Sequence, residues 1–337
     1  MPSNYALKPA EPLDPQITSI QPGGGDVMEV ELAWGRVRRW YLKTFRQGYV
    51  EGMARVRRGT ENTAPHEVLD PRDVKYYRNL GGYSWDRKDD PFAWRDNIPF
   101  ARPGLAELLI YTFLTFGWAG IAAWTLRRFE LPLWVVIPGW LLVTTLTVIG
   151  LLIVWFFRNP QRRIPEGDHL VVSPADGKLV LIERVEHDDS IGGPAVKFGI
   201  FLSIFNVHTN RTPIACRVVK MAYFKGKYLN ALNPESAKVN EKLELSIQGT
   251  QAPFRPMIVR QIAGAIARRI VCWVQPGEEL LSGTLFGMIK FGSRTELVLP
   301  DEPGLEIIAK LGEAVKGGST ILARYAESAL ASQLPQN

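Results

Sequence analysis

Two long apolar segments constrain this chain more than any other feature of its sequence. Residues 108–126 and 131–157 contain no charged side chain, and the short connection between them carries Arg127, Arg128 and Glu130. A helix of about 20 apolar residues is long enough to cross the hydrocarbon core of a bilayer. The two segments therefore predict a membrane helical hairpin over residues 105–157.

The orientation of this hairpin can be inferred from the charges at its ends. Basic residues flank both ends: Arg102, Arg158, Arg162 and Arg163. The positive-inside rule then predicts the cell (inner) membrane with the following domain on the cytoplasmic side, although Arg127 and Arg128 argue the other way. Two alternatives remain open. The segments could form a buried helix pair, or Pro132 and Pro138 could make the second one kinked or re-entrant.

Residues 1–104 form an N-terminal extension that we expect to be partly disordered. Residues 1–25 are rich in Pro and Gly and read as a disordered tail, with no basic-then-apolar run typical of a signal peptide. Residues 27–58 have the apolar spacing of an amphipathic helix with basic residues on its other positions. This helix could lie on an anionic membrane or pack against its own protein, and both interpretations stay open.

Residues 158–325 change character and predict a separate domain, followed by a tail over 326–337. Short β-rich runs alternate with Gly, Pro and Asn: 170–173, 178–185, 196–204, 214–224, 257–262, 270–274, 286–291 and 295–299. Strands at this spacing are typical of an antiparallel barrel or sandwich. The expected class is therefore α+β, with a mainly antiparallel β-barrel or sandwich after the helical hairpin. The turn residues 173–177 predict a β-hairpin at that point.

Three residues of this domain carry the groups of a serine nucleophile and its activating partners. His208 follows an apolar strand, Asp176 is the acid of the turn 173–177, and Gly292-Ser293 is one of two late Gly-Ser pairs. A hydroxyl, an imidazole and a carboxylate together form the arrangement that makes a serine oxygen nucleophilic. Each residue alone is more often structural, and spacing does not show that the three meet.

The overall charge limits the classes of binding partner, and the two cysteines limit the metal and disulfide sites that the chain can form. The net charge of +6 suits nucleic acid, an anionic membrane or an anionic substrate, and the apolar segments favour the lipid alternatives. Cys216 and Cys272 lie in apolar stretches without neighbouring Cys or His at metal-ligand spacing. We expect two small core residues and no metal site.

Five blocks, in this order, resemble the short, bacterial and archaeal form of phosphatidylserine decarboxylase. They are FFRNPQRRIP (156–165), VVSPADGK (171–178), FLSIFNVHTNRTP (201–213), QIAGAIARRIVCWV (261–274) and FGMIKFGSRTELVLP (286–300). The resemblance covers roughly residues 105–325 and includes the preceding membrane hairpin. It implies a proenzyme that decarboxylates phosphatidylserine to phosphatidylethanolamine in phospholipid biosynthesis.

The resemblance also implies roles for particular residues. Autocatalytic cleavage falls between Gly292 and Ser293, with Asp176 and His208 completing the triad, and Ser293 becomes a pyruvoyl group that forms a Schiff base with the substrate amine. The long form has a second histidine at the position of Arg211 here, so Arg211 or His208 takes that role. Gly318-Ser319 mimics the long form's cleavage motif but lies outside the matching block, which favours Ser293.

The remaining expectations concern partners and alternatives. Substrate phosphate contacts are assigned to Arg211, Lys225 and Lys242, although the lysines are more simply a solvated basic face. The expected partners are a membrane phospholipid and the two cleaved chains held as a heterodimer, with no nucleic acid, and the possibility of a higher oligomer stays open. The rival hypotheses are a non-catalytic membrane-tethered β-domain that binds lipid or protein, and a decarboxylase of another serine-bearing phospholipid.

Overall fold

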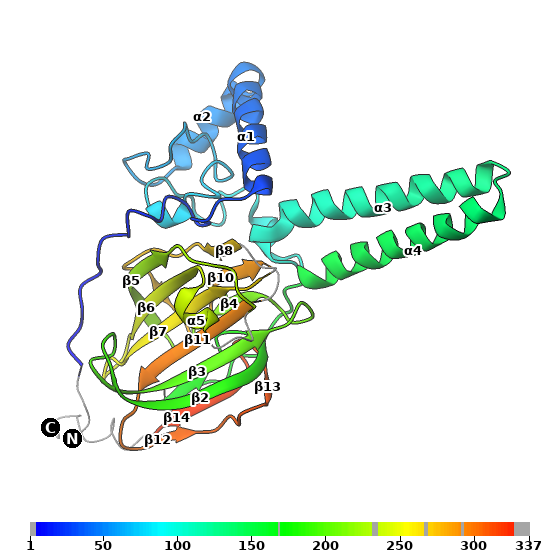
Figure 1. Cartoon of the computed structure of the whole chain (residues 1–337). Helices are drawn as coiled ribbons and strands as arrows, with labels where there is room; N and C mark the ends of the chain where they lie inside the picture. The colour runs from blue at the N-terminus through cyan, green and yellow to red at the C-terminus, as the bar shows by residue number, and fades with distance from the viewer. Residues whose placement is uncertain (1–4, 168, 231–234, 266–268, 291–292, 327–337) are drawn as a thin grey trace. The chain divides into compact units, whose positions relative to one another are not determined.

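The computed structural model describes residues 5–167, 169–230, 235–265, 269–290 and 293–326. The chain divides into two compact units, one made of residues 1–94 and 161–337 and the other of residues 95–160. Figure 1 shows the first unit as a curled β-sheet domain with the N-terminal extension, and the second as a helical hairpin. The two units are described separately below.

An eight-stranded antiparallel sheet forms the centre of the first unit. Its strand order is β13-β2-β3-β11-β7-β6-β5-β9. The bounds are β2 (Gly177–Asp188), β3 (Gly193–Leu202), β5 (Cys216–Phe224), β6 (Lys242–Gly249), β7 (Pro256–Ala263), β9 (Glu279–Leu280), β11 (Ser293–Pro300) and β13 (Ala314–Val315). A one-turn helix, α5 (Ser236–Val239), precedes β6. The central strand β11 is buried along its whole length between β3 and β7.

Two three-stranded antiparallel sheets cover one face of this large sheet. Their orders are β1-β14-β12 and β4-β10-β8. The bounds are β1 (Leu170–Val172), β4 (Thr209–Arg211), β8 (Arg269–Cys272), β10 (Leu285–Lys290), β12 (Leu305–Ile307) and β14 (Ile321–Tyr325). One apolar cluster joins side chains of all three sheets, including Phe198 of β3, Phe286 of β10 and Leu322 of β14. The domain is therefore two packed layers around one core.

The predicted class, α+β with mainly antiparallel strands, is confirmed. Each of the predicted β-rich runs overlaps an observed strand, with Phe291 outside the described residues. Among the described strands the sheet does not close into a barrel, because its order ends at β13 on one side and β9 on the other. The sandwich alternative is closer to the observed architecture.

The β-hairpin predicted at residues 173–177 is wrong. β1 pairs with β14, whereas β2 pairs with β3 and β13, so the turn carries the chain from a small sheet to the large one. Gly177 permits this change of sheet, because a Cβ there would lie 2.3 Å from the carbonyl oxygen of Phe201. Local turn chemistry is the same for both arrangements, and only the long-range pairing distinguishes them.

The N-terminal extension differs from the disordered tail that its composition suggests. Ile17 and Ile20 are buried, and the amide of Cys272 donates a hydrogen bond to the Ile20 carbonyl at 2.8 Å. The amide of Glu11 likewise bonds the Val219 carbonyl at 2.8 Å. These few buried apolar side chains and backbone hydrogen bonds attach residues 5–25 to the domain, and average composition does not reveal them.

Two helices replace the single amphipathic helix expected over residues 27–58. They are α1 (Asp26–Phe45) and α2 (Gln47–Val56), and the backbone leaves the helical region at Arg46. A 3-10 turn, η1 (Arg78–Leu80), follows later in the extension. The side chain of Asn79 in that turn donates to the Ser19 carbonyl at 2.9 Å, which ties the later part of the extension to its first segment.

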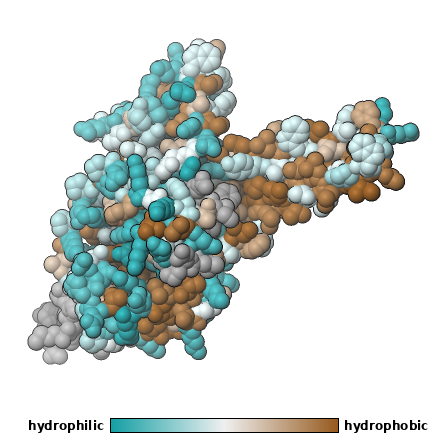
Figure 2. All heavy atoms as spheres, viewed as in Figure 1, coloured by the Kyte–Doolittle hydropathy of each residue, from teal (hydrophilic) through white to brown (hydrophobic). Residues whose placement is uncertain are grey.

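The second unit is an antiparallel pair of helices, α3 (Leu105–Arg128) and α4 (Leu133–Phe156). Gly139 and Gly150 of α4 pack against Leu126 and Phe116 of α3. Threonine hydroxyls along both helices, such as those of Thr115 and Thr147, bond the carbonyl four residues earlier, which leaves the surface apolar. Figure 2 shows this surface as predominantly hydrophobic. Both helices have the length and composition of membrane spans.

Candidate active site

Ser293 is the first residue of β11 and faces the core. It pairs with Leu202 of β3 and Ala263 of β7, and paired residues of an antiparallel sheet share a face. Ser293 is 0% exposed, and its Oγ has no hydrogen-bond partner within the described ranges. An unsatisfied buried hydroxyl costs about 1–3 kcal/mol, so such a group calls for a chemical reason. Gly292 lies outside the described residues.

His208 directly precedes β4, in the small sheet β4-β10-β8. The amide of Ile289, near the end of β10, donates to the His208 carbonyl at 3.1 Å. The imidazole is 0% exposed, and its Nδ1 lies 2.9 Å from the Asn206 carbonyl oxygen. A carbonyl oxygen only accepts, so Nδ1 carries a proton, and in the neutral form of the ring the lone pair is then on Nε2. This tautomer is the one that a general base needs.

Asp176 lies just before β2, two strands away from β11. Lys178 pairs with Phe201, and Phe201 pairs with Arg294 on its other side, so Asp176 belongs to the same end of the sheet as Ser293. With neighbouring strands about 4.8 Å apart, β2 and β11 lie about 10 Å from each other. The Asp176 carboxylate accepts a 2.6 Å ion-pair bond from Arg162 Nη2 and a 2.8 Å bond from the Gly317 amide.

Arg211 belongs to the same charged group. Burial lowers the pKa of its guanidinium first, the nearby Arg162 lowers it further, and Asp176 acts in the opposite direction. Arg211 Nη1 donates to the Gly283 carbonyl at 2.9 Å. Gly318, with φ of +75°, approaches so closely that a Cβ there would lie 2.8 Å from Arg211 Cδ. One carboxylate and two guanidiniums are thus packed under the turn that contains Gly317 and Gly318.

The two lysines expected to contact substrate are not brought to this site. Lys225 is exposed in the loop after β5. Lys242 is in register with Ile262 and, through it, with Arg294, so its side chain leaves the face of the sheet opposite to Ser293. There it pairs with Glu244 at 3.2 Å and lies 4.9 Å from the ring centroid of Phe224.

Several polar residues near the site were missed by sequence reasoning. The Gln261 amide donates to Asn210 Oδ1 at 2.9 Å, and the Asn210 amide donates to Thr295 Oγ1 at 3.0 Å, with all three residues buried. Gln21 of the N-terminal extension accepts a 2.9 Å bond from the buried Lys290. The available signal was a polar residue inside an otherwise apolar strand, as in Gln261 and Thr295.

Comparisons with known proteins place this chain in a family. Residues 149–323 match the family model described as phosphatidylserine decarboxylase. The chain belongs to this family. The phosphatidylserine decarboxylase proenzyme of Rhodopirellula baltica is 50% identical over 252 residues, which cover 75% of this chain and 99% of that protein. The proenzyme of Syntrophus aciditrophicus is 38% identical over 239 residues, covering 71% of this chain and 100% of its own.

Membership of the phosphatidylserine decarboxylase family confirms the resemblance read from the five blocks and the expected enzyme class, a carboxy-lyase. The matched range begins within α4 and ends within β14, so it contains Asp176, His208, Arg211 and Ser293. The family's proenzyme names agree with an expected precursor. The described contacts of the site join Asp176 to Arg162 and to Gly317, while the imidazole of His208 is held by Asn206.

Proposed function

We propose that the chain decarboxylates phosphatidylserine to phosphatidylethanolamine after cutting itself between Gly292 and Ser293. The observation that carries the proposal is the Ser293 hydroxyl, which is buried at the start of a central strand without a partner among the described residues. The family relatives are named as proenzymes of this activity. A hydroxyl kept free of competing hydrogen bonds is available to attack its own peptide bond.

In this proposal His208 is the general base for self-cleavage. Nε2 takes the Ser293 hydroxyl proton, and Oγ attacks the Gly292 carbonyl carbon. The C–N bond breaks as the ester forms, and the departing nitrogen of Ser293 receives the proton. A base then removes the Cα proton of residue 293, the Cβ–O bond breaks, and the Gly292 carboxylate leaves as the new C-terminus. The remaining dehydroalanine takes up water and loses ammonia, which leaves a pyruvoyl group at position 293.

Asp176 contributes charge rather than protons. Its carboxylate stabilises the imidazolium that forms when His208 takes the serine proton. The bonds from Arg162 and Gly317 hold this carboxylate in place. Arg211, packed in the same charged group, takes the place of the long form's second histidine and attracts the anionic head group of the substrate.

Position 293 fits a pyruvoyl group because it is buried on the inner face of the sheet, where bulk water is excluded. When formed, the ketone supplies the electron sink that decarboxylation of an amino acid requires. β3 and β7 flank β11, and His208 lies beside β10.

The two cleavage products stay together in this proposal. The short chain, residues 293–337, contributes β11 to the centre of the large sheet and β14 to the centre of a small sheet. Pairing with β3 and β7 runs along most of β11, and these backbone bonds are independent of the 292–293 peptide bond. The result is a heterodimer of two non-covalently paired chains.

We also propose that α3 and α4 span the cell membrane with the β-domain in the cytoplasm. Their threonine hydroxyls are satisfied within each helix, as a hydrocarbon environment requires. Protease accessibility in membrane vesicles tests the orientation. Release of the whole chain by an alkaline wash would refute the span without touching the catalytic proposal.

Intact mass measurement tests the cleavage. Wild-type protein should give two chains, the shorter beginning with a keto group at position 293, and should release CO2 from phosphatidylserine vesicles. Ser293→Ala should remain a single chain of 37.8 kDa and be inactive. Ser319→Ala, the matched second Gly-Ser site, should be cleaved normally. A whole wild-type chain, or cleavage of the Ser293 variant, contradicts the proposal.

A further inference from the structure

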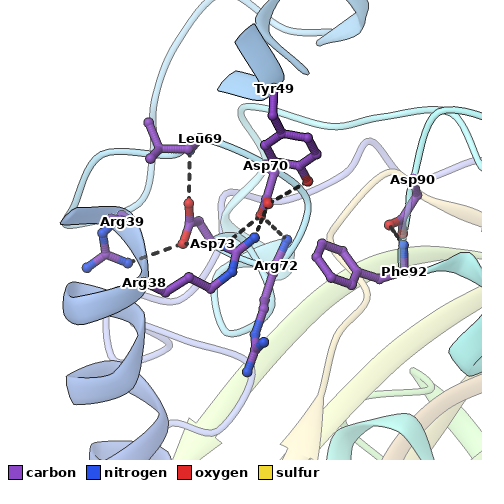
Figure 3. A network of polar contacts seen from close by, with 9 residues as sticks. All are labelled: Arg38, Arg39, Tyr49, Leu69, Asp70, Arg72, Asp73, Asp90 and Phe92. Atoms are coloured by element: carbon purple, nitrogen blue, oxygen red, sulfur yellow. Dashed lines mark hydrogen bonds and ion pairs between the residues drawn. The ribbon is translucent and has the colours of Figure 1, made fainter. Parts of the chain in front are cut away.

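Helix α1 turns the charged side chains of Glu31, Arg38 and Arg39 toward the rest of the extension. Arg38 forms a two-pronged ion pair with Asp70, with Nη1 at 3.1 Å from Oδ1, and Arg39 Nη1 lies 3.3 Å from Asp73 Oδ1. Tyr49 of α2 donates to the same Asp70 carboxylate at 2.8 Å. Figure 3 shows these side chains converging from α1 and α2 on the segment that carries both aspartates.

This network fixes how α1 is rotated about its own axis. Asp70 is 0% exposed, and removing its cation would leave a buried charge uncompensated. Glu31, on the same side of the helix, pairs with Lys75 at 2.5 Å, and Met28 and Leu42 are the buried residues of α1. The inward face of α1 is therefore set by ion pairs at several levels along the helix.

The apolar stripe of α1 consequently faces outward. The α1 stripe consists of Val30, Trp34, Val37, Tyr41 and Phe45, whose spacing of three and four residues puts them on one side of a helix. These side chains are 56%, 53%, 53%, 46% and 60% exposed, and the neighbouring Trp40 is 63% exposed. A contiguous exposed row of large apolar side chains marks an interaction surface.

The composition of this surface favours lipid over protein. Trp and Tyr are the residues enriched where a bilayer meets water, and basic residues border the stripe. Residues 26–58 contain eight basic and four acidic side chains, a balance of +4. Arg36 and Arg46 are exposed and have no ion pair within the described part of the chain. The same chain carries two helices with the length and composition of membrane spans, which favours a bilayer as the partner of this surface.

We propose that α1 lies on a bilayer surface with the α1 stripe inserted at the boundary of head groups and acyl chains. The ion pairs with Asp70 and Asp73 hold the helix in this orientation before any lipid is met. The basic side chains beside the stripe then contact anionic head groups, as in other surface-lying amphipathic helices. The extension thereby acts as a second membrane contact in addition to the helical hairpin.

A fluorescent probe at position 37 tests this in the full-length protein. Val37→Cys is labelled with an environment-sensitive dye and reconstituted in vesicles of phosphatidylglycerol and phosphatidylcholine. Burial raises the pKa of the two native thiols, Cys216 and Cys272, to about 12, and both are 0% exposed, so labelling is confined to the introduced cysteine. Lys43→Cys is the matched control, about 120° around the same helix.

The expected result is a blue-shifted emission at position 37, strong quenching by nitroxide-labelled lipids and weak quenching by aqueous iodide, with the reverse at position 43. Replacing Tyr41 and Phe45 by Glu should abolish the lipid quenching at position 37. Equal iodide quenching at the two positions overturns the proposal. So does a probe shielded from iodide but untouched by lipid quenchers, since a protein partner would then cover the stripe. None of these readouts depends on self-cleavage or decarboxylation.

Discussion

The backbone amide of Gly317 donates a 2.8 Å hydrogen bond to Oδ1 of Asp176, although 141 residues separate them in the chain. The other carboxylate oxygen binds Arg162, which lies 14 residues before Asp176. One buried carboxylate thus joins the segment after α4, the turn before β2 and the turn before β14. This junction stands at the same end of the large sheet as Ser293.

Replacing Asp176 by Asn should slow self-cleavage strongly. The amide keeps the shape of the carboxylate but not its charge, so Arg162 and Arg211 lose their shared counter-ion and the imidazolium of His208 is less stabilised. The measurement is the appearance of the two fragments over time on a denaturing gel. Asp188→Asn is the control, because Asp188 is a carboxylate at the far end of β2, the strand that follows Asp176, and is paired with Lys197. Equal rates for wild type and Asp176→Asn would contradict the assigned role.

Asn206→Ala should also slow cleavage while leaving His208 in the chain. The Asn206 side chain accepts bonds from the amide and the hydroxyl of Ser203, both at 2.8 Å, and these fix the turn whose carbonyl holds His208 Nδ1. Ser203→Ala removes only the hydroxyl bond and should have a smaller effect in the same fragment assay. A larger effect from Ser203→Ala would mean that the turn is not what positions the imidazole.

Thr295→Val should destabilise the protein without creating a cavity. The substitution leaves the Asn210 amide without its buried acceptor, at a cost of about 1–3 kcal/mol in the free energy of unfolding. Thermal or denaturant unfolding of the solubilised protein measures this. Thr320→Val is the control, since the Thr320 hydroxyl accepts an exposed bond from the Lys316 amide that water can replace. Equal losses in the two variants would argue against a structural role for the buried network.

The ion pair of Asp188 should make stability depend on pH in the acid range. Burial would raise the pKa of this carboxyl, but Lys197 at 3.1 Å and the Ser190 amide outweigh burial and lower it. The resulting stabilisation is present above the ordinary carboxyl pKa and is lost as the pH falls through the lower pKa of the folded state. Wild type should therefore unfold at a higher temperature than Asp188→Asn at neutral pH, and the difference should shrink on acidification. If the difference in unfolding temperature between the two proteins grew toward acid pH, the ion pair would not be lowering the pKa of Asp188.

Much of the fold could be predicted because its signals are local. Uninterrupted apolar runs identified the positions of α3 and α4, and β-branched residues bounded by turn residues located the strands that form most of the large sheet. β6 and β14 were missed, since Lys242, Glu244 and Arg324 give these strands a polar pattern. Their outward residues are satisfied by cross-strand ion pairs such as Glu244 with Arg260 and Arg324 with Glu306, which depend on register.

By itself, the sequence determined the family, the class of fold, the apolar hairpin and the residues offered for catalysis, because these depend on residue types and on short spacings. Three features became visible in the folded chain alone: the turn before Gly177 changes sheets, Asp176 is held by Arg162 and Gly317, and α1 faces its apolar stripe outward. Each of these depends on pairs of groups far apart in the chain. Such pairs form only when the burial of one core brings them within hydrogen-bonding distance, and no local pattern encodes that distance.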